Sequence, residues 1–163
     1  MGLGVAVAIV LAAAALVVSL VRQPAESVAT APSSDPTTSA GDTTAADKAL
    51  CKEVAPLLRE IIDIGKRFVA LGTSGTGPRD NGIPGFRDEV EDWVKRIQPI
   101  IDRNAYPPRF LTRTLQTEVD FKHLYAANIR PGPELDADAQ AWNIAAIAYG
   151  GPFEVCNALG VSW

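Results

Sequence analysis

The only histidine of the chain is the first candidate for chemistry. Asp120 lies three residues before His123, and Glu118 lies five residues before it. On a helix, a carboxylate three residues from an imidazole shares its face, and such a pair does acid–base work or binds metal. A di-metal site in a helical bundle needs two Glu-x-x-His motifs, and Asp120-x-x-His123 is the nearest approach to one. The pattern therefore favours a solvated histidine beside a surface acid, and we predict no metal ligands.

The glycine-rich segment 72–79 is the second candidate, because its glycines are spaced as in a phosphate-binding loop. The Lys-Ser/Thr pair that must follow such a loop is missing, and no strand is predicted before it. We predict a connector between helices that is open to contact by a partner. Neither Ser74 nor Ser162 lies in a nucleophile-elbow sequence. The sequence therefore predicts no catalytic, cofactor-binding or metal-binding residues, no cofactor, and a protein that is not an enzyme.

The two cysteines are the third candidate. Cys51 and Cys156 both lie in apolar patterns, 105 residues apart. In an oxidising compartment they would form one disulfide, and the alternative is two buried free thiols. No Cys-x-x-Cys motif occurs, so neither a redox enzyme nor a zinc ribbon is indicated. Because an apolar N-terminal run delivers the chain to a membrane, we predict the Cys51–Cys156 disulfide.

That apolar run covers residues 3–21, which are 19 residues without a charge. At about 1.5 Å per residue it spans roughly 28 Å, close to the hydrocarbon thickness of a bilayer. Arg22 closes the run and Pro24 discourages further helix. We predict a transmembrane anchor over residues 1–22, with the lipid bilayer as partner through residues 3–21.

Several alternatives to this anchor remain open. A signal peptide cleaved after Ala29 or Ala31 would release a secreted soluble protein, although the run is longer than a typical signal core. The true start of the chain can also lie upstream. Arg22 alone would place its flank in the cytoplasm by the positive-inside tendency. The cysteines favour the opposite, a single-pass cell-membrane protein whose C-terminal domain is extracytoplasmic.

Residues 23–46 follow as a linker, in which 19 of 24 residues are Ala, Thr, Ser, Pro or Gly. Such a composition buries too little apolar surface to offset its ordering entropy, so we predict a disordered tether. Beyond it, residues 47–163 are predicted to form one extracytoplasmic helical domain.

Helical periodicity dominates that domain and no run alternates as a strand would. We predict an all-α fold, an antiparallel bundle of four helices followed by a short C-terminal helix. Pro56 should kink or split the first helix, and Gly150-Gly151-Pro152 should end the fourth and begin the short one. The four predicted helices cover residues 45–71, 84–103, 108–128 and 134–149, and the short one runs to Leu159.

The composition excludes a strongly basic nucleic-acid binder, because the net charge is −4 and the pI is near 5.0. The order of an apolar span, a polar tether and a helical unit bracketed by Cys51 and Cys156 resembles small single-pass membrane-anchored or exported actinobacterial proteins of unknown function. The resemblance is one of layout and implies no site residues. We expect a binding or structural module for a protein or cell-envelope partner. The alternative is a small-ligand binder or enzyme with a bundle cavity lined by Trp142 and Tyr125.

Overall fold

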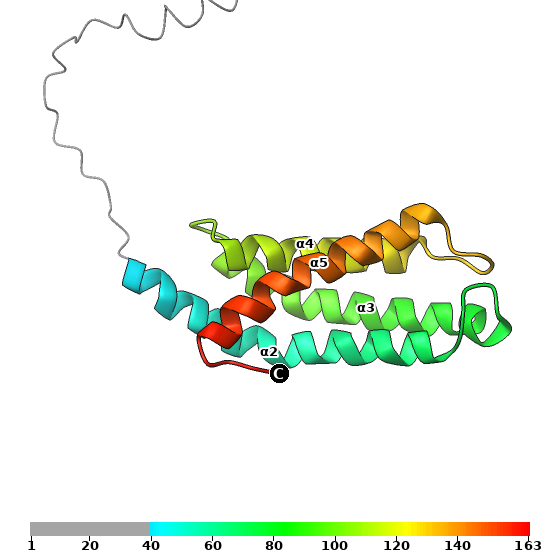
Figure 1. Ribbon diagram of the computed structural model, residues 1–163, viewed down its shortest axis with the longest axis horizontal. Helices are drawn as coiled ribbons and strands as arrows, with labels where there is room; N and C mark the ends of the chain where they lie inside the picture. Colours follow the sequence, from blue (N-terminus) through cyan, green and yellow to red (C-terminus); the bar gives the residue numbers. More distant parts are fainter. Residues whose placement is uncertain (1–39) are drawn as a thin grey trace, which may run out of the picture. The chain divides into compact units, whose positions relative to one another are not determined.

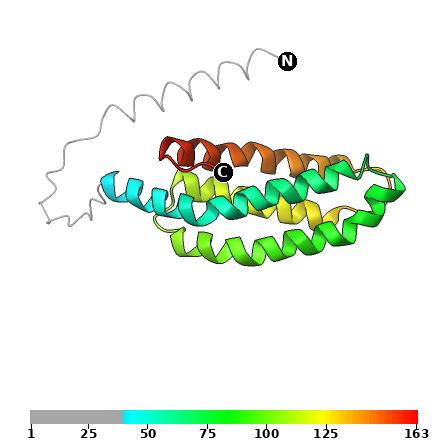
Figure 2. The ribbon, with the colours of Figure 1, turned by 90° about the horizontal axis from the view of Figure 1, so that it is seen from below.

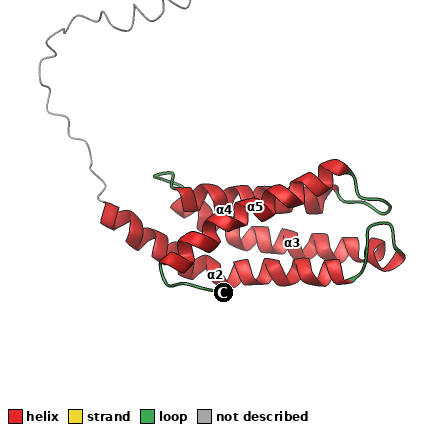
Figure 3. Cartoon of the chain, in the orientation of Figure 1, coloured by secondary structure: helices red, strands yellow, loops and turns green. Residues whose placement is uncertain are grey.

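The computed structural model describes residues 40–163, which form four helices and contain no strand. The helices are α2 (Ala40–Ala70), α3 (Gly77–Asn104), α4 (Phe110–Asn128) and α5 (Asp136–Ala158). Figure 3 shows them joined by loops, so the predicted all-α class is confirmed for this part of the chain. None of the four helices combines the length and apolar character needed to cross a membrane. The predicted anchor 1–22 lies outside the described residues, as do residues 23–39 of the predicted linker.

The four helices form a bundle in which successive helices run in opposite directions (Figures 1 and 2). Contacts join α2 to α3, α3 to α4, α4 to α5 and α5 to α2. Each helix contributes an apolar stripe to one core, because residues three or four apart share a helix face. The largest fully buried apolar side chains are those of Trp93, Leu50, Leu58, Ile64, Ile97, Ile101, Leu111 and Leu115.

Helix α2 differs from its prediction at two places. It begins at Ala40, so residues 40–46, expected to belong to the disordered linker, are its first turns. It also continues through Pro56, although Figure 1 shows that its first half changes direction. Pro56 is exposed, so the Lys52 carbonyl that loses its helical donor lies on the water side. The helix therefore bends without being split.

The segment between the first two predicted helices, expected to be a connector, is partly helical, because α3 begins at Gly77 with Pro78 in its first turn. Tertiary contacts hold this turn. The guanidinium of Arg79 donates to the Phe68 carbonyl (2.8 Å) and to the Tyr125 hydroxyl (3.0 Å). The Asp80 carboxylate accepts from the backbone N–H of Gly75 (3.3 Å) and of Gly132 (3.0 Å). These contacts join the α2–α3 and α4–α5 loops to α3.

The predicted break at Gly150-Gly151-Pro152 is wrong, because α5 runs through it to Ala158 and no separate C-terminal helix exists in residues 136–163. Gly151 is buried against α4. A Cβ atom there would lie 2.3 Å from Thr114 Oγ1 and 2.6 Å from Thr114 Cβ. The glycine thus permits a close approach of two helices and does not end one.

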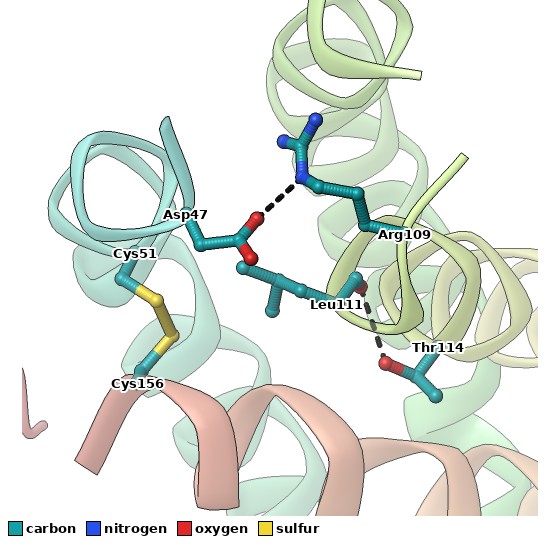
Figure 4. The surroundings of a disulfide bond; sticks show 6 residues. All are labelled: Asp47, Cys51, Arg109, Leu111, Thr114 and Cys156. Atoms are coloured by element: carbon teal, nitrogen blue, oxygen red, sulfur yellow. Dashed lines mark hydrogen bonds and ion pairs between the residues drawn. A yellow bond between two sulfur atoms is a disulfide. The ribbon is translucent and has the colours of Figure 1, made fainter. Parts of the chain in front are cut away.

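The predicted disulfide between Cys51 and Cys156 is present and joins α2 to α5 (Figure 4). Both cysteines are fully buried. Beside the disulfide, Arg109 Nε lies 2.6 Å from a carboxylate oxygen of Asp47, which links α2 to the start of α4. The first and last helices are therefore covalently joined across 105 residues of sequence.

Substitution of each of the two neighbouring glycines of α5 by alanine should have opposite effects on the stability of the domain. Nothing lies within 4 Å of a Cβ at Gly150, so Gly150→Ala should stabilise the domain by about 0.5–1 kcal/mol through helix propensity. Gly151→Ala should destabilise it by about 1–3 kcal/mol, because Thr114 must move. Urea unfolding followed by circular dichroism measures both. Equal effects of the two substitutions would contradict the close α4–α5 contact.

Candidate functional site

A cavity of about 490 Å³ lies between α2, α4 and α5. Its volume falls within the range of small-molecule sites, roughly 300–1,000 Å³. One side reaches the surface, since Val69 in its wall is 58% exposed. The wall is mostly apolar and consists of Ile61, Ile62, Gly65, Lys66, Val69 and Ala70 of α2, Glu118 and Lys122 of α4, and Trp142, Ala146 and Tyr149 of α5.

Helical spacing on α4 brings two ionisable residues into this wall. On α4, Leu111 and Leu115 are core residues, and steps of three and four from Leu115 lead to Glu118 and Lys122. The same face therefore begins in the core and ends in the cavity. On α2, Gly65 leaves space for the indole of Trp142, since a Cβ there would lie 3.1 Å from Trp142 Cη2.

Glu118 is the unusual residue of the cavity, because its side chain is buried without a partner. The residue is 1% exposed, and no hydrogen bond or ion pair joins its carboxyl to any residue that the structure describes. Its Oε2 atom is fully buried. Burial raises the pKa of Glu118 to about 8, and the nearby charge of Lys122 opposes this only in part. At neutral pH the group is therefore a carboxylic acid that both donates and accepts.

Lys122 places a second polar group at the same wall. Its Nζ lies 3.3 Å from the centroid of the Trp142 ring, a geometry that favours the ammonium form. Burial lowers the pKa of Lys122 to about 8, against the opposing effect of Glu118. Within residues 40–163 no carboxylate forms an ion pair with it. At neutral pH the cavity thus holds an ammonium group beside an uncharged carboxyl.

Tyr149 completes the wall and is held by the end of the chain. Trp163 Nε1 donates to the Tyr149 hydroxyl (2.7 Å), and both rings pack edge-on or tilted against Phe153. Burial raises the pKa of Tyr149, and the hydrogen bond from Trp163 opposes this shift in part. Trp163 therefore packs against the C-terminal half of α5.

Of the residues singled out from the sequence, Glu118 and Trp142 line the cavity, whereas His123 and Asp120 do not. His123 and Asp120 are exposed and not bonded to each other, and Asp120 accepts from Gln116 instead (2.7 Å). In residues 40–163 no three His, Cys, Asp or Glu side chains are grouped to hold a metal ion. Trp142 does line the cavity, whereas Tyr125 does not, although its ring centroid lies 5.0 Å from that of Trp142.

Sequence reasoning named Glu118 only as a neighbour of His123 and did not name Lys122. A signal was present, because both residues lie on the helix face defined by Leu111 and Leu115. An acidic residue at a core position of an amphipathic helix is rare unless it is paired.

A second hollow lies between α4 and α5, with about 430 Å³ lined by Phe110, Thr114, Thr117, Ile144, Ile147, Ala148 and Gly151. This apolar groove is exposed, since Ile147 is 79% and Phe110 is 64% exposed. It contains no ionisable side chain. It can bury apolar surface, but it has no group that would orient a polar ligand or react with one.

No protein-family model, curated protein or solved structure matches the chain. Function must therefore be inferred from the site, because a helical bundle hosts many unrelated functions. The fold and the cavity define a class: an all-α bundle with one apolar pocket that contains a buried acid and an amine.

The buried carboxyl predicts a pH dependence of stability. Because the folded-state pKa of Glu118 is about 8 and its ordinary value is 4.5, the folded chain binds this proton more tightly, and stability falls between these pH values. Glu118→Gln removes this slope, so it should match the original protein at pH 5 and exceed it at pH 8 by at least about 1 kcal/mol. Urea midpoints at both pH values measure this.

The matched control is Glu91→Gln, since Glu91 is exposed on α3. This substitution should leave the pH dependence of the urea midpoint unchanged. If the profiles of the original protein and of Glu118→Gln run parallel from pH 5 to 8, the carboxyl is already ionised at pH 5 and the assigned protonation state is wrong.

Proposed function

We propose that residues 47–163 form a binding domain for an amphiphilic small molecule, anchored outside the cell by residues 1–22. The observation that carries the proposal is the unpartnered carboxyl of Glu118 in the wall of a 490 Å³ apolar cavity. Ligand sites typically combine apolar walls with a few placed polar groups, which is the composition of this wall. The envelope partner expected from the sequence is thereby specified as an amphiphile.

Energetics support a functional role for this cavity. A buried polar group without a hydrogen bond costs about 1–3 kcal/mol, and replacing Glu118 by an apolar residue would remove that cost. Natural chains break such local rules mainly at functional sites. A ligand whose head bonds to Glu118 while its body covers the apolar wall would offset the penalty.

The proposed location rests on two separate features. The uncharged run 3–21 has the length of a membrane span, and the Cys51–Cys156 disulfide is typical of oxidising compartments. Together they favour a single-pass protein with its helical domain on the extracytoplasmic side. Cleavage after Ala29 or Ala31 would instead yield a secreted form with the same cavity.

An enzymatic role is the second candidate, because an acid and an amine with shifted pKa values also suit proton transfer. The observation favouring it is that both groups line one cavity. Chemical conversion of the bound molecule would decide for it, and its unchanged recovery supports the binding role.

The binding proposal predicts where a ligand contacts the chain. With the full chain in lipid nanodiscs, a dodecanol carrying a diazirine should photolabel the cavity segments 61–70 of α2 and 142–149 of α5, located by mass spectrometry. Ala146→Phe fills the cavity and should reduce this labelling at least tenfold. Ala137→Phe, on the same helix outside the cavity, should leave it unchanged.

Labelling at the apolar groove provides a further control. Ile147→Lys alters that groove and does not touch the cavity wall, so labelling of segments 61–70 and 142–149 should persist. Adducts that vanish with Ile147→Lys and persist with Ala146→Phe would place the ligand in the groove and refute the proposal.

The proposed location predicts the redox state of the cysteines. In cells quenched with acid, a polymer-coupled maleimide should leave the full chain unshifted on a gel, and reduction before labelling should add two tags to Cys51 and Cys156. A cytoplasmic protein with reduced cysteines serves as the control, because the maleimide should shift it on the gel without prior reduction. Two reactive thiols without reduction would contradict an extracytoplasmic domain.

A further inference from the structure

We infer that the amphiphile carries a carboxylate head, which Lys122 and Glu118 bind together at the wall of the cavity. This inference rests on the proposed function and adds the chemical class of the ligand. Its basis is the juxtaposition of the Lys122 ammonium, on the face of Trp142, with the buried carboxyl of Glu118 in the same wall. Within residues 40–163, no hydrogen bond or ion pair joins either group to another side chain.

The ammonium of Lys122 supplies the charge that selects an anion. It is held 3.3 Å from the ring centroid of Trp142, while the surrounding wall is built from side chains such as Ile61 and Ala146. A cation that is partly removed from water without a counter-ion is costly, and a ligand anion would restore its pairing. Lys66 is the other cation at this wall, but it is exposed and lies 3.7 Å from Asp63.

The carboxyl of Glu118 supplies the hydrogen-bond donor. As an uncharged acid it donates its O–H to one oxygen of a carboxylate, while Lys122 donates to the other. An O–H bond to an ionised oxygen is short and strong. The hydroxyl of Tyr149, the remaining titratable group of the wall, is held in place by the hydrogen bond that it accepts from Trp163. Two donors thus match the two oxygens of one singly charged head.

Other head groups fit these two residues less well. An ammonium head would lie beside the Lys122 cation and would require Glu118 to ionise in an apolar wall. An alcohol would satisfy Glu118 but leave Lys122 without a counter-ion. A doubly charged phosphate carries more charge than one ammonium neutralises and more oxygens than the two groups can bond. The apolar body of the ligand would occupy the rest of the cavity.

The test compares head groups on ligands that share a twelve-carbon alkyl chain. It uses the full chain of the protein in nanodiscs and the photolabelling of segments 61–70 and 142–149. Dodecanoate, dodecanol, dodecylamine and dodecyl phosphate compete with the diazirine dodecanol. Dodecanoate should compete at least tenfold better than dodecanol. Lys122→Met keeps a chain of similar length without charge and should reduce this ratio to near one.

Ratios between variants cancel the partitioning of each competitor into the lipid. Lys95→Met, which removes an exposed charge on α3 outside the cavity, should retain the original ratio. Glu118→Gln keeps a donor and should lower the ratio only severalfold. Continued labelling by the neutral probe shows that each variant is folded.

Each outcome separates the two proposals. An unchanged ratio in Lys122→Met, or preference for dodecylamine or dodecyl phosphate, overturns the carboxylate head while the cavity remains a binding site. Failure of every competitor, together with failure of the probe to label the cavity segments, overturns the proposed function itself.

Discussion

The unequal packing of α5 on its two neighbours determines the rest of this structure. α5 contacts α4 along its length and contacts α2 far less. Small side chains make the first contact close: Ala141, Ala145 and Gly151 are buried, and Gly151 admits the side chain of Thr114. Because α5 leans on α4, the side facing α2 is incompletely filled, and the cavity lies there.

Two contacts join α2 and α5 along the interface between these helices. One is the Cys51–Cys156 disulfide, and the other is the indole of Trp142 against Gly65. Gly65 lies 14 residues after Cys51, and Trp142 lies 14 residues before Cys156. The two contacts are therefore consistent with one antiparallel register of α2 and α5. Cavity residues such as Ile61 and Ala146 fall between these two contacts. The wall also includes Lys66, Val69 and Ala70, which lie beyond Gly65 on α2, so the Gly65–Trp142 contact is part of the cavity wall.

The predictable part of the fold is the part that depends on local periodicity. Apolar steps of three and four located all four helices, and the two cysteines located the α2–α5 link. The boundaries failed where distant residues decide them. Arg79 and Asp80 draw residues 77–82 into α3 through contacts with Phe68, Tyr125 and Gly132. Gly151 is helical because Thr114 lies against it, whereas the isolated Gly-Gly-Pro sequence is typical of a helix end.

The site was less predictable than the fold for an electrostatic reason. Charged residues in an amphipathic helix are ordinarily solvated or paired, as in the exposed pairs Arg67–Glu89, Arg96–Glu60 and Arg103–Glu53 that join α2 to α3. Glu118 and Lys122 differ only because α5 fails to fill the space beside them, and this depends on three helices at once.

A domain that leaves one seam underfilled must hold that seam by other means. The contacts between α2 and α5 are few, and surface ion pairs of the kind found between α2 and α3 are each worth about 0–1 kcal/mol. In the chain-entropy account, a disulfide closing a loop of about 100 residues contributes about 4–5 kcal/mol. The Cys51–Cys156 link lies on the sparsely packed seam, where noncovalent contacts alone would be weakest. The cavity and the position of the disulfide thus follow from the same packing. Helix α5 packs closely on α4, and the disulfide joins it to α2, where noncovalent contacts are few.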